Sequence, residues 1–230
     1  MGKVIIQSEY TTRNPITMIG TEAGICWGAD TSDTQKNYKR GLDCLESEHG
    51  RTFEFPDIYM ILDGYSARVI REWYTHIGGA PTRLQASTRY IDYEHGFSYV
   101  TPNTPAFSGR ALAVYDRVMH SIMEGLRELD ELGVPREDSA LCLPLGMTTK
   151  IVDKRNLRNL MDMSHQRMCT RAYHEYRQLF ADIRAALNGY SPEWNYIVDH
   201  YLMPKCQYMG FCKERHTCGM MPRKQVVTGG

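Results

Sequence analysis

Residues 108–132, SGRALAVYDRVMHSIMEGLRELDEL, carry the clearest structural pattern in this chain. Hydrophobic residues recur there at alternating spacings of three and four: Leu112, Tyr115, Met119, Ile122, Leu126 and Leu129. This spacing is typical of an amphipathic helix, and Gly133 and Pro135 are suited to end it. We therefore predict a long helix over 108–132.

Other helices are predicted on both sides of this segment. Residues 32–35, SDTQ, resemble a capping box, which predicts a polar helix to about residue 49. We expect its Tyr38, Leu42 and Leu45 to face inward. Further helices are expected at 67–75, 157–168, 172–187 and 192–201.

Short hydrophobic runs predict strands between these helices. Three runs, separated by turn residues, indicate a small antiparallel sheet: 4–6, 16–19 and 25–27. A further strand is expected at 53–62, where Pro56 favours an edge or a bulge, and another at 145–152. Together the helices and strands predict a helix-rich α+β fold. No repeat or linker interrupts it, so we predict one domain over 1–203 and a Cys-rich tail over 204–230.

Composition excludes several classes of protein. The chain has 230 residues, of which 42% are hydrophobic and 23% charged, as in ordinary globular proteins. Its 27 basic residues balance 27 acidic ones, so a nucleic-acid partner is not expected. We expect no signal peptide and no membrane span, because no long hydrophobic run is present. Seven cysteines, an odd number, argue against a disulfide framework and favour a cytoplasmic protein.

The segment 75–90, THIGGAPTRLQASTRY, has the features of an anion-binding loop. Residues 87–90, Ser-Thr-Arg-Tyr, offer a phosphate a hydroxyl, successive backbone N–H groups and a guanidinium. The small residues at 78–80 allow close approach of the backbone to a ligand. The segment predicts a phosphorylated ligand.

A second set of candidate site residues lies on the helix predicted at 157–168. Arg158, Asp162 and His165 share one stripe of it, at i, i+4 and i+7. A solvated face with an intrahelical ion pair explains this stripe equally well. Arg167 lies off the stripe near the helix end, where an arginine also suits the helix dipole.

The tail contains a possible metal site. Cys206, Cys212, His216 and Cys218 could bind zinc as a Cys₃His site, although their spacing matches no common tight CxxC knuckle. Cysteines that bind no metal are the alternative. Elsewhere, neither Cys142 nor Cys169 has an adjacent histidine that would indicate a catalytic Cys–His pair. The chain also contains no P-loop and no GxGxxG motif.

Taken together, these segments resemble the flavin-dependent thymidylate synthases. That family's signature begins Arg-His-Arg and ends Ser-x-Arg-Tyr, whereas residues 75–77 here are Thr-His-Ile and residues 87–90 match the end. The resemblance covers about residues 40–180. It extends, in the family's order, to Ser47-Glu48-His49, Leu143-Pro144-Leu145-Gly146, Thr149-Lys150, Asn156-Leu157-Arg158 and Arg167.

The resemblance implies a helix-rich fold with a central, mostly antiparallel sheet, and a catalytic domain over 1–203. It implies reductive methylation of dUMP to dTMP with FAD, methylenetetrahydrofolate and NADPH, in a homotetramer. The implied catalytic residue is Arg167, which would bind the pyrimidine and favour its electron-rich form. The other implied dUMP contacts are Glu72, Gln85, Ser87, Thr88, Arg89 and Lys150. The implied FAD contacts are Glu48, Thr75, His76, Ile77, Asn156, Arg158 and Asp162.

The signature departs from the family at its beginning. Thr75 and Ile77 replace two arginines, and the interval from His76 to Ser87 is two residues longer. Arg83, inside this longer loop, is our candidate for the missing charge. Two alternatives remain: a degenerate relative that binds nucleotide without turnover, and an interaction protein with a zinc-binding tail.

Overall fold

The computed structural model describes residues 2–93 and 95–224. These residues form two compact units. The first unit contains residues 2–3, 61–75 and 83–152, and the second contains residues 4–60, 76–82 and 153–224. The domain boundary predicted at 203/204 stays a prediction, and residues 225–230 of the predicted tail lie outside the described residues.

A four-stranded antiparallel sheet has the strand order β1-β2-β4-β3. The strands are β1 (Lys3–Ile6), β2 (Asp57–Ser66), β3 (Thr82–Gln85) and β4 (Thr148–Asn156). The strand predicted at 53–62 begins later, because Pro56 follows the 3₁₀ helix η1 (Gly50–Glu54). The strand predicted at 145–152 is likewise shifted toward the C-terminus. Alternate residues of β2, Ile58, Met60 and Leu62, are fully buried.

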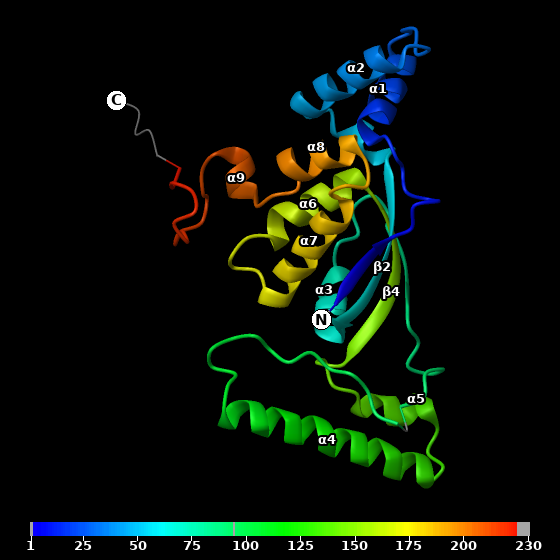
Figure 1. Cartoon of the computed structure of the whole chain (residues 1–230), viewed down its shortest axis with the longest axis vertical. Coiled ribbons are helices and arrows are strands. Elements are labelled where there is room, and N and C mark those ends of the chain that lie inside the picture. The colour runs from blue at the N-terminus through cyan, green and yellow to red at the C-terminus, as the bar shows by residue number, and fades with distance from the viewer. Residues whose placement is uncertain (1, 94, 225–230) are drawn as a thin grey trace. The chain divides into compact units, whose positions relative to one another are not determined.

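The strands predicted at 16–19 and 25–27 are wrong. Residues Pro15–Cys26 form helix α1, and only the run at 4–6 is a strand. Proline suits the first turn of a helix, and the glycines allow α1 to pack closely on α2 (Thr34–Glu46). A Cβ added to Gly20 would lie 1.8 Å from the Asn37 carbonyl oxygen, and one added to Gly41 would lie 1.9 Å from that of Ile16. This contact between two helices, seen side by side in Figure 1, overrides the local preference for strand.

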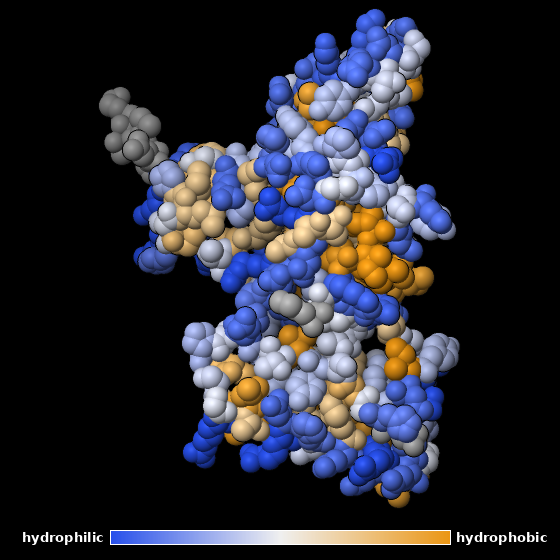
Figure 2. Space-filling model, viewed as in Figure 1, coloured by the Kyte–Doolittle hydropathy of each residue, from blue (hydrophilic) through white to orange (hydrophobic). Residues whose placement is uncertain are grey.

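Helix α2 begins one residue later than the capping-box interpretation implied. The Asp33 carboxylate caps it by accepting hydrogen bonds from the N–H groups of Gln35 (2.9 Å) and Lys36 (3.1 Å). Leu45 is fully buried as expected, whereas Tyr38 and Leu42 are only half-buried. Hydrophilic residues cover most of this helix on the face shown in Figure 2.

The second unit also contains four helices from the C-terminal half of the chain. These are α6 (Leu157–Arg167), α7 (His174–Leu187), α8 (Pro192–His200) and α9 (Lys205–Met209). The first three confirm the sequence predictions, and α9 was not predicted. Their buried faces supply large core side chains: Leu157, Leu160, Tyr176, Phe180, Trp194 and Ile197. Helix α9 packs against α6 (Figure 1).

The first unit contains the two other predicted helices. Helix α3 (Ala67–Trp73) is capped by the buried Ser66 hydroxyl, which accepts a hydrogen bond from the Val69 N–H. Helix α4 (Arg110–Glu131) confirms the long amphipathic segment, and Met119 and Leu126 are its buried residues. Two short helical segments, α5 (Arg136–Ser139) and η2 (Ala140–Cys142), follow it.

The predicted helix-rich α+β fold class is confirmed. No helix within the described ranges is long and hydrophobic enough to cross a membrane.

Candidate active site

The end of α6 positions Arg167 in the second unit. Asn156 caps this helix by accepting a hydrogen bond from the Asn159 N–H at 2.9 Å. Leu157 and Leu160 are fully buried and so fix the rotation of the helix. This arrangement places Arg167, the last residue of the helix, beside His76 from a distant part of the sequence.

Contacts with His76 and Tyr176 help to hold the guanidinium of Arg167 in place. Its Nε donates a hydrogen bond to His76 Nε2 at 2.9 Å. Its guanidinium carbon lies 4.8 Å from the ring centroid of Tyr176, a fully buried residue of α7. Tyr176 also meets the His76 ring edge-on, with the two centroids 6.4 Å apart. A cation held over an aromatic face loses little further freedom when it binds a ligand.

The surroundings of His76 keep its imidazole neutral. Burial lowers its pKa to about 4, and the positive charges of Arg167 and Arg155 add to this effect. A neutral imidazole has one nitrogen that accepts a hydrogen bond, as the contact with Arg167 requires. His76 therefore acts as an acceptor toward Arg167 near neutral pH.

The loop after His76 packs against the beginning of α6. Gly79 has a φ of +71°, and a Cβ added there would lie 2.3 Å from the Asn156 side-chain nitrogen. That nitrogen donates to the Gly79 carbonyl at 3.5 Å. The small residues predicted to approach a ligand therefore also approach Asn156. Ile77 is 70% exposed, where the family signature has an arginine.

Arg158 and Glu48, two predicted cofactor residues, each contact a residue of the second unit that was not predicted as a site residue. Arg158 forms an ion pair with Glu54 of η1 at 2.6 Å, so the intrahelical pairing with Asp162 is not its principal contact. Glu48 has a φ of +53° and accepts a hydrogen bond from the Tyr208 hydroxyl of α9 at 2.7 Å. Burial and this bond to Glu48 raise the pKa of Tyr208. Asp162 is exposed on α6.

The predicted phosphate segment lies in the first unit beside β4. The Ala86 N–H donates to the Lys150 carbonyl at 2.8 Å, and Gln85 Nε2 donates to Thr149 Oγ1 at 3.4 Å. These bonds bring residues 85–89 next to Lys150. Ser87 Oγ in turn accepts a hydrogen bond from the Arg89 N–H at 3.3 Å. Predicted phosphate contacts from two distant segments are thus brought together.

The cations of this segment already have carboxylate partners on the protein. Arg89 Nε lies 3.1 Å from Glu137, and Lys150 Nζ lies 3.0 Å from Asp63. The side chains of Arg89 and Lys150 are 65% and 56% exposed. Such exposed ion pairs contribute little to stability, about 0–1 kcal/mol, so an incoming phosphate can displace them.

Arg83 is held against α3. Its Nη1 donates to the Tyr74 carbonyl at 2.9 Å, and its guanidinium carbon lies 4.5 Å from the Tyr74 ring centroid. Glu72 and Thr75 belong to the same end of α3, where the Thr75 hydroxyl donates to the Glu72 carbonyl at 2.7 Å. Tyr74 and Tyr176 were not predicted as site residues, because aromatic residues near a helix carry no signal that separates packing from binding.

The predicted Cys₃His zinc site is not formed in the structure. Cys206 is half-buried, Cys212 is buried, and Cys218 and His216 are exposed. All seven cysteines are free thiols. Across residues 2–93 and 95–224, no three His, Cys, Asp or Glu side chains are placed closely enough to hold a metal ion.

Comparison with known proteins shows the family to which the chain belongs. The model of the family described as thymidylate synthase complementing protein matches residues 8–193. The chain belongs to this family. The matched range contains both Arg167 with His76 and the phosphate segment at 85–89, whereas the tail cysteines lie beyond it.

Two proteins named flavin-dependent thymidylate synthase are similar in sequence to this chain. A flavin-dependent thymidylate synthase from Geobacter sulfurreducens is 31% identical over 109 residues, which is 47% of each chain. One from Clostridium tetani is 25% identical over 245 residues, covering 95% of this chain and 94% of that protein.

Solved structures share the fold of this family member. Thymidylate synthase X from Helicobacter pylori, solved with FAD and dUMP, is similar with a TM-score of 0.68 and 18% identity. The match covers 88% of this chain and 99% of that one. A UMP/dUMP methylase from Streptomyces cacaoi, bound with 5-Br dUMP, gives a TM-score of 0.67 at 17% identity, with 87% and 96% covered.

Proposed function

We propose that this protein is a flavin-dependent thymidylate synthase that converts dUMP to dTMP. Methylenetetrahydrofolate would supply the carbon and NADPH the reducing equivalents, and the enzyme would work as a cytoplasmic homotetramer. The observation that carries the proposal is the Arg167–His76 contact, within a chain that belongs to the thymidylate synthase complementing protein family.

Arg167 is the proposed catalytic residue. Carbon 5 of uracil is a poor nucleophile, and it becomes more reactive when negative charge on the ring is stabilised. A guanidinium fixed by His76 and Tyr176 is suited to that task, because it needs no reorganisation when charge develops. Neutral His76 adds no second positive charge that would repel it. This route needs no cysteine nucleophile.

The phosphate of dUMP is proposed to bind at residues 85–89 and Lys150. Backbone N–H groups, the Ser87 and Thr88 hydroxyls and two cations fit a dianionic phosphate. Displacement of Glu137 and Asp63 would release Arg89 and Lys150 for this ligand. Glu72 completes the proposed dUMP contacts.

The second unit offers residues that fit part of a flavin. Gly79 lets the loop after His76 lie directly against Asn156, since a Cβ there would collide with that side chain. Asn156, Arg158 and Glu48 provide hydrogen-bonding groups of both kinds. With His76, Ile77 and Asp162 of the same unit, they are proposed FAD contacts. Thr75 and Arg83, which belong to the first unit, are the other two. The bound flavin would supply hydride for the reduction.

One experiment tests binding and turnover separately. The purified protein should be yellow, and it should release tritium from [5-³H]dUMP when methylenetetrahydrofolate and NADPH are present. Arg167→Met should lower turnover by at least about 100-fold, the loss typical of removing one stabilising donor. Arg117→Met, on the exposed face of α4, is the matched control.

The exposed Ile77 favours one other candidate, a relative that binds nucleotide without turnover. That candidate predicts dUMP binding by calorimetry with no tritium release. A colourless protein that takes up neither FAD nor dUMP would overturn both functions.

A further inference from the structure

Three thiols from distant parts of the sequence line one cavity in the second unit. The cavity has a volume of about 400 Å³. Cys169 reaches it from the end of α6, Cys206 from α9, and Cys212 from the segment after α9. Cys169 did not belong to the zinc site predicted from the tail sequence, and it lies two residues after Arg167.

A fourth thiol belongs to the same segment as Cys212. Cys218 follows Cys212 by six residues and is exposed on the irregular stretch after α9. His216, the fourth ligand expected from the sequence, is exposed and is not among the residues that line the cavity.

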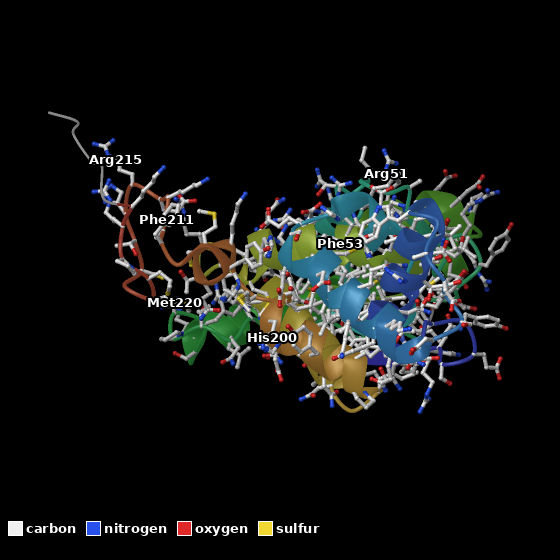
Figure 3. The ribbon with its side chains drawn as sticks, turned by 90° about the horizontal axis from the view of Figure 1, so that it is seen from above. Arg51, Phe53, His200, Phe211, Arg215 and Met220 are labelled. Carbon is white, nitrogen blue, oxygen red and sulfur yellow. The ribbon has the colours of Figure 1, made fainter. Side chains whose placement is uncertain are left out.

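The segment after α9 has little else to stabilise it. Residues 210–224 contain neither a helix nor a strand, apart from an isolated bridge between Cys212 and Arg223. Residues 213–220 are all exposed. Figure 3 shows Phe211, Arg215 and Met220 on this irregular stretch beyond α9. Such short segments, with few buried side chains, commonly depend on a metal ion or a disulfide for a fixed structure.

We propose that Cys169, Cys206, Cys212 and Cys218 together bind one zinc ion. Four thiolates are a complete ligand set for a tetrahedral structural zinc. Lys205 and Lys213 line the same cavity, as do Arg171 and its ion-pair partner Glu214. The two lysines favour the thiolate forms and offset part of the net negative charge of such a centre. The site would fasten the tail to the end of α6, close to Arg167.

Zinc binding includes a closing movement of the tail. In the described residues, 2–93 and 95–224, the thiols are too far apart to coordinate one metal ion together. Structural zinc sites are rarely preformed without the ion, and binding provides the free energy that assembles them. Cys218, on the exposed stretch, has the least packing to prevent its movement.

Metal analysis of the full-length protein tests this proposal. The purified chain should contain about one zinc per chain, the content of a single Cys₄ site. Serine substitution of Cys169, Cys206, Cys212 or Cys218 should each lower the zinc content at least several-fold. Cys26→Ser and Cys142→Ser, which change exposed thiols elsewhere in the chain, should leave it unchanged. Cys169→His, which restores a zinc ligand, should retain more metal than Cys169→Ser.

Absorption spectroscopy of the cobalt(II)-substituted protein provides a second test in case a variant folds poorly. Cobalt(II) in place of zinc should give the intense visible bands and thiolate charge-transfer absorption of a tetrahedral thiolate site, weakened in Cys218→Ser. Folded protein with no zinc and four titratable thiols would overturn the proposal. Disulfides between these cysteines would also overturn it, as would a zinc content unaffected by Cys169→Ser.

Discussion

Arg167 Nε and His76 Nε2 lie 2.9 Å apart, although 91 residues separate them in the sequence. The imidazole accepts this hydrogen bond only while it is uncharged, and its environment keeps it so. The histidine of the signature segment thus positions the arginine at the end of α6. This relationship gives the first two predictions.

Replacing Arg167 should raise the pKa of His76. In Arg167→Met, a positive charge is removed while burial remains, so the pKa should move up from about 4 without reaching 6.5. An NMR titration of the His76 ring protons measures this change. Arg171→Met removes a nearby charge that pairs with Glu214 and should leave the pKa unchanged. An unaltered His76 pKa in Arg167→Met would contradict the contact.

Acid should destabilise the protein between pH 6.5 and about 4. The pKa of His76 is lower in the folded state than its ordinary value of 6.5, so the unfolded chain binds more protons in this range. The stabilisation is complete above pH 6.5 and is lost as the pH falls toward 4. Burial also lowers the pKa of His165, which acts in the same direction. In urea unfolding across this range, His76→Gln should show a shallower pH dependence; an identical slope would be evidence against a neutral His76.

Two glycine substitutions should have opposite effects on stability. The Cβ of Gly41→Ala would lie 1.9 Å from the Ile16 carbonyl oxygen and force α1 and α2 apart. We expect a loss of about 1–3 kcal/mol, the usual cost of overpacking. Gly125→Ala in α4 meets no atom within 4 Å and should stabilise the helix by about 0.5–1 kcal/mol. Thermal unfolding of both variants measures the contrast, and similar melting temperatures would refute it.

The buried ion pair of β4 should be costly to break. Arg155 donates two hydrogen bonds of 2.6 Å to Asp153, and both side chains are fully buried. Asp153→Asn removes the carboxylate charge that pairs with the buried guanidinium and should cost about 3–5 kcal/mol. The double variant Asp153→Leu/Arg155→Met should recover most of that loss. Urea unfolding measures both, and a double variant less stable than Asp153→Asn would argue against this account.

Arg83→Ala tests whether the longer signature loop replaces the missing arginines. We expect at least about tenfold weaker binding of FAD or dUMP, equal to 1.4 kcal/mol, because one charged contact is removed. Fluorescence titration of FAD and calorimetry of dUMP measure the two affinities. Arg117→Ala removes the same charge from the exposed face of α4 and should change neither. Unchanged affinity for both ligands in Arg83→Ala would exclude the replacement.

The sequence by itself determined the elements whose signals are local. Helices α4, α6, α7 and α8 follow from hydrophobic spacing, since each side chain on a helix face is placed by its near neighbours. The phosphate segment could be recognised because its hydroxyls, N–H groups and guanidinium are consecutive. These features depend on residues only a few positions apart.

Only the tertiary structure decided the features that join distant segments. Residues 15–26 form helix α1, although their short hydrophobic runs predicted strands, because the glycines of α1 and α2 allow the two helices to pack closely. Burial and Arg167 made His76 neutral, and the end of α6 brought Cys169 to the tail thiols. The physical reason is the same in each case. Packing, desolvation and charge depend on neighbours in space, and no local pattern in the sequence records which distant residues those neighbours are.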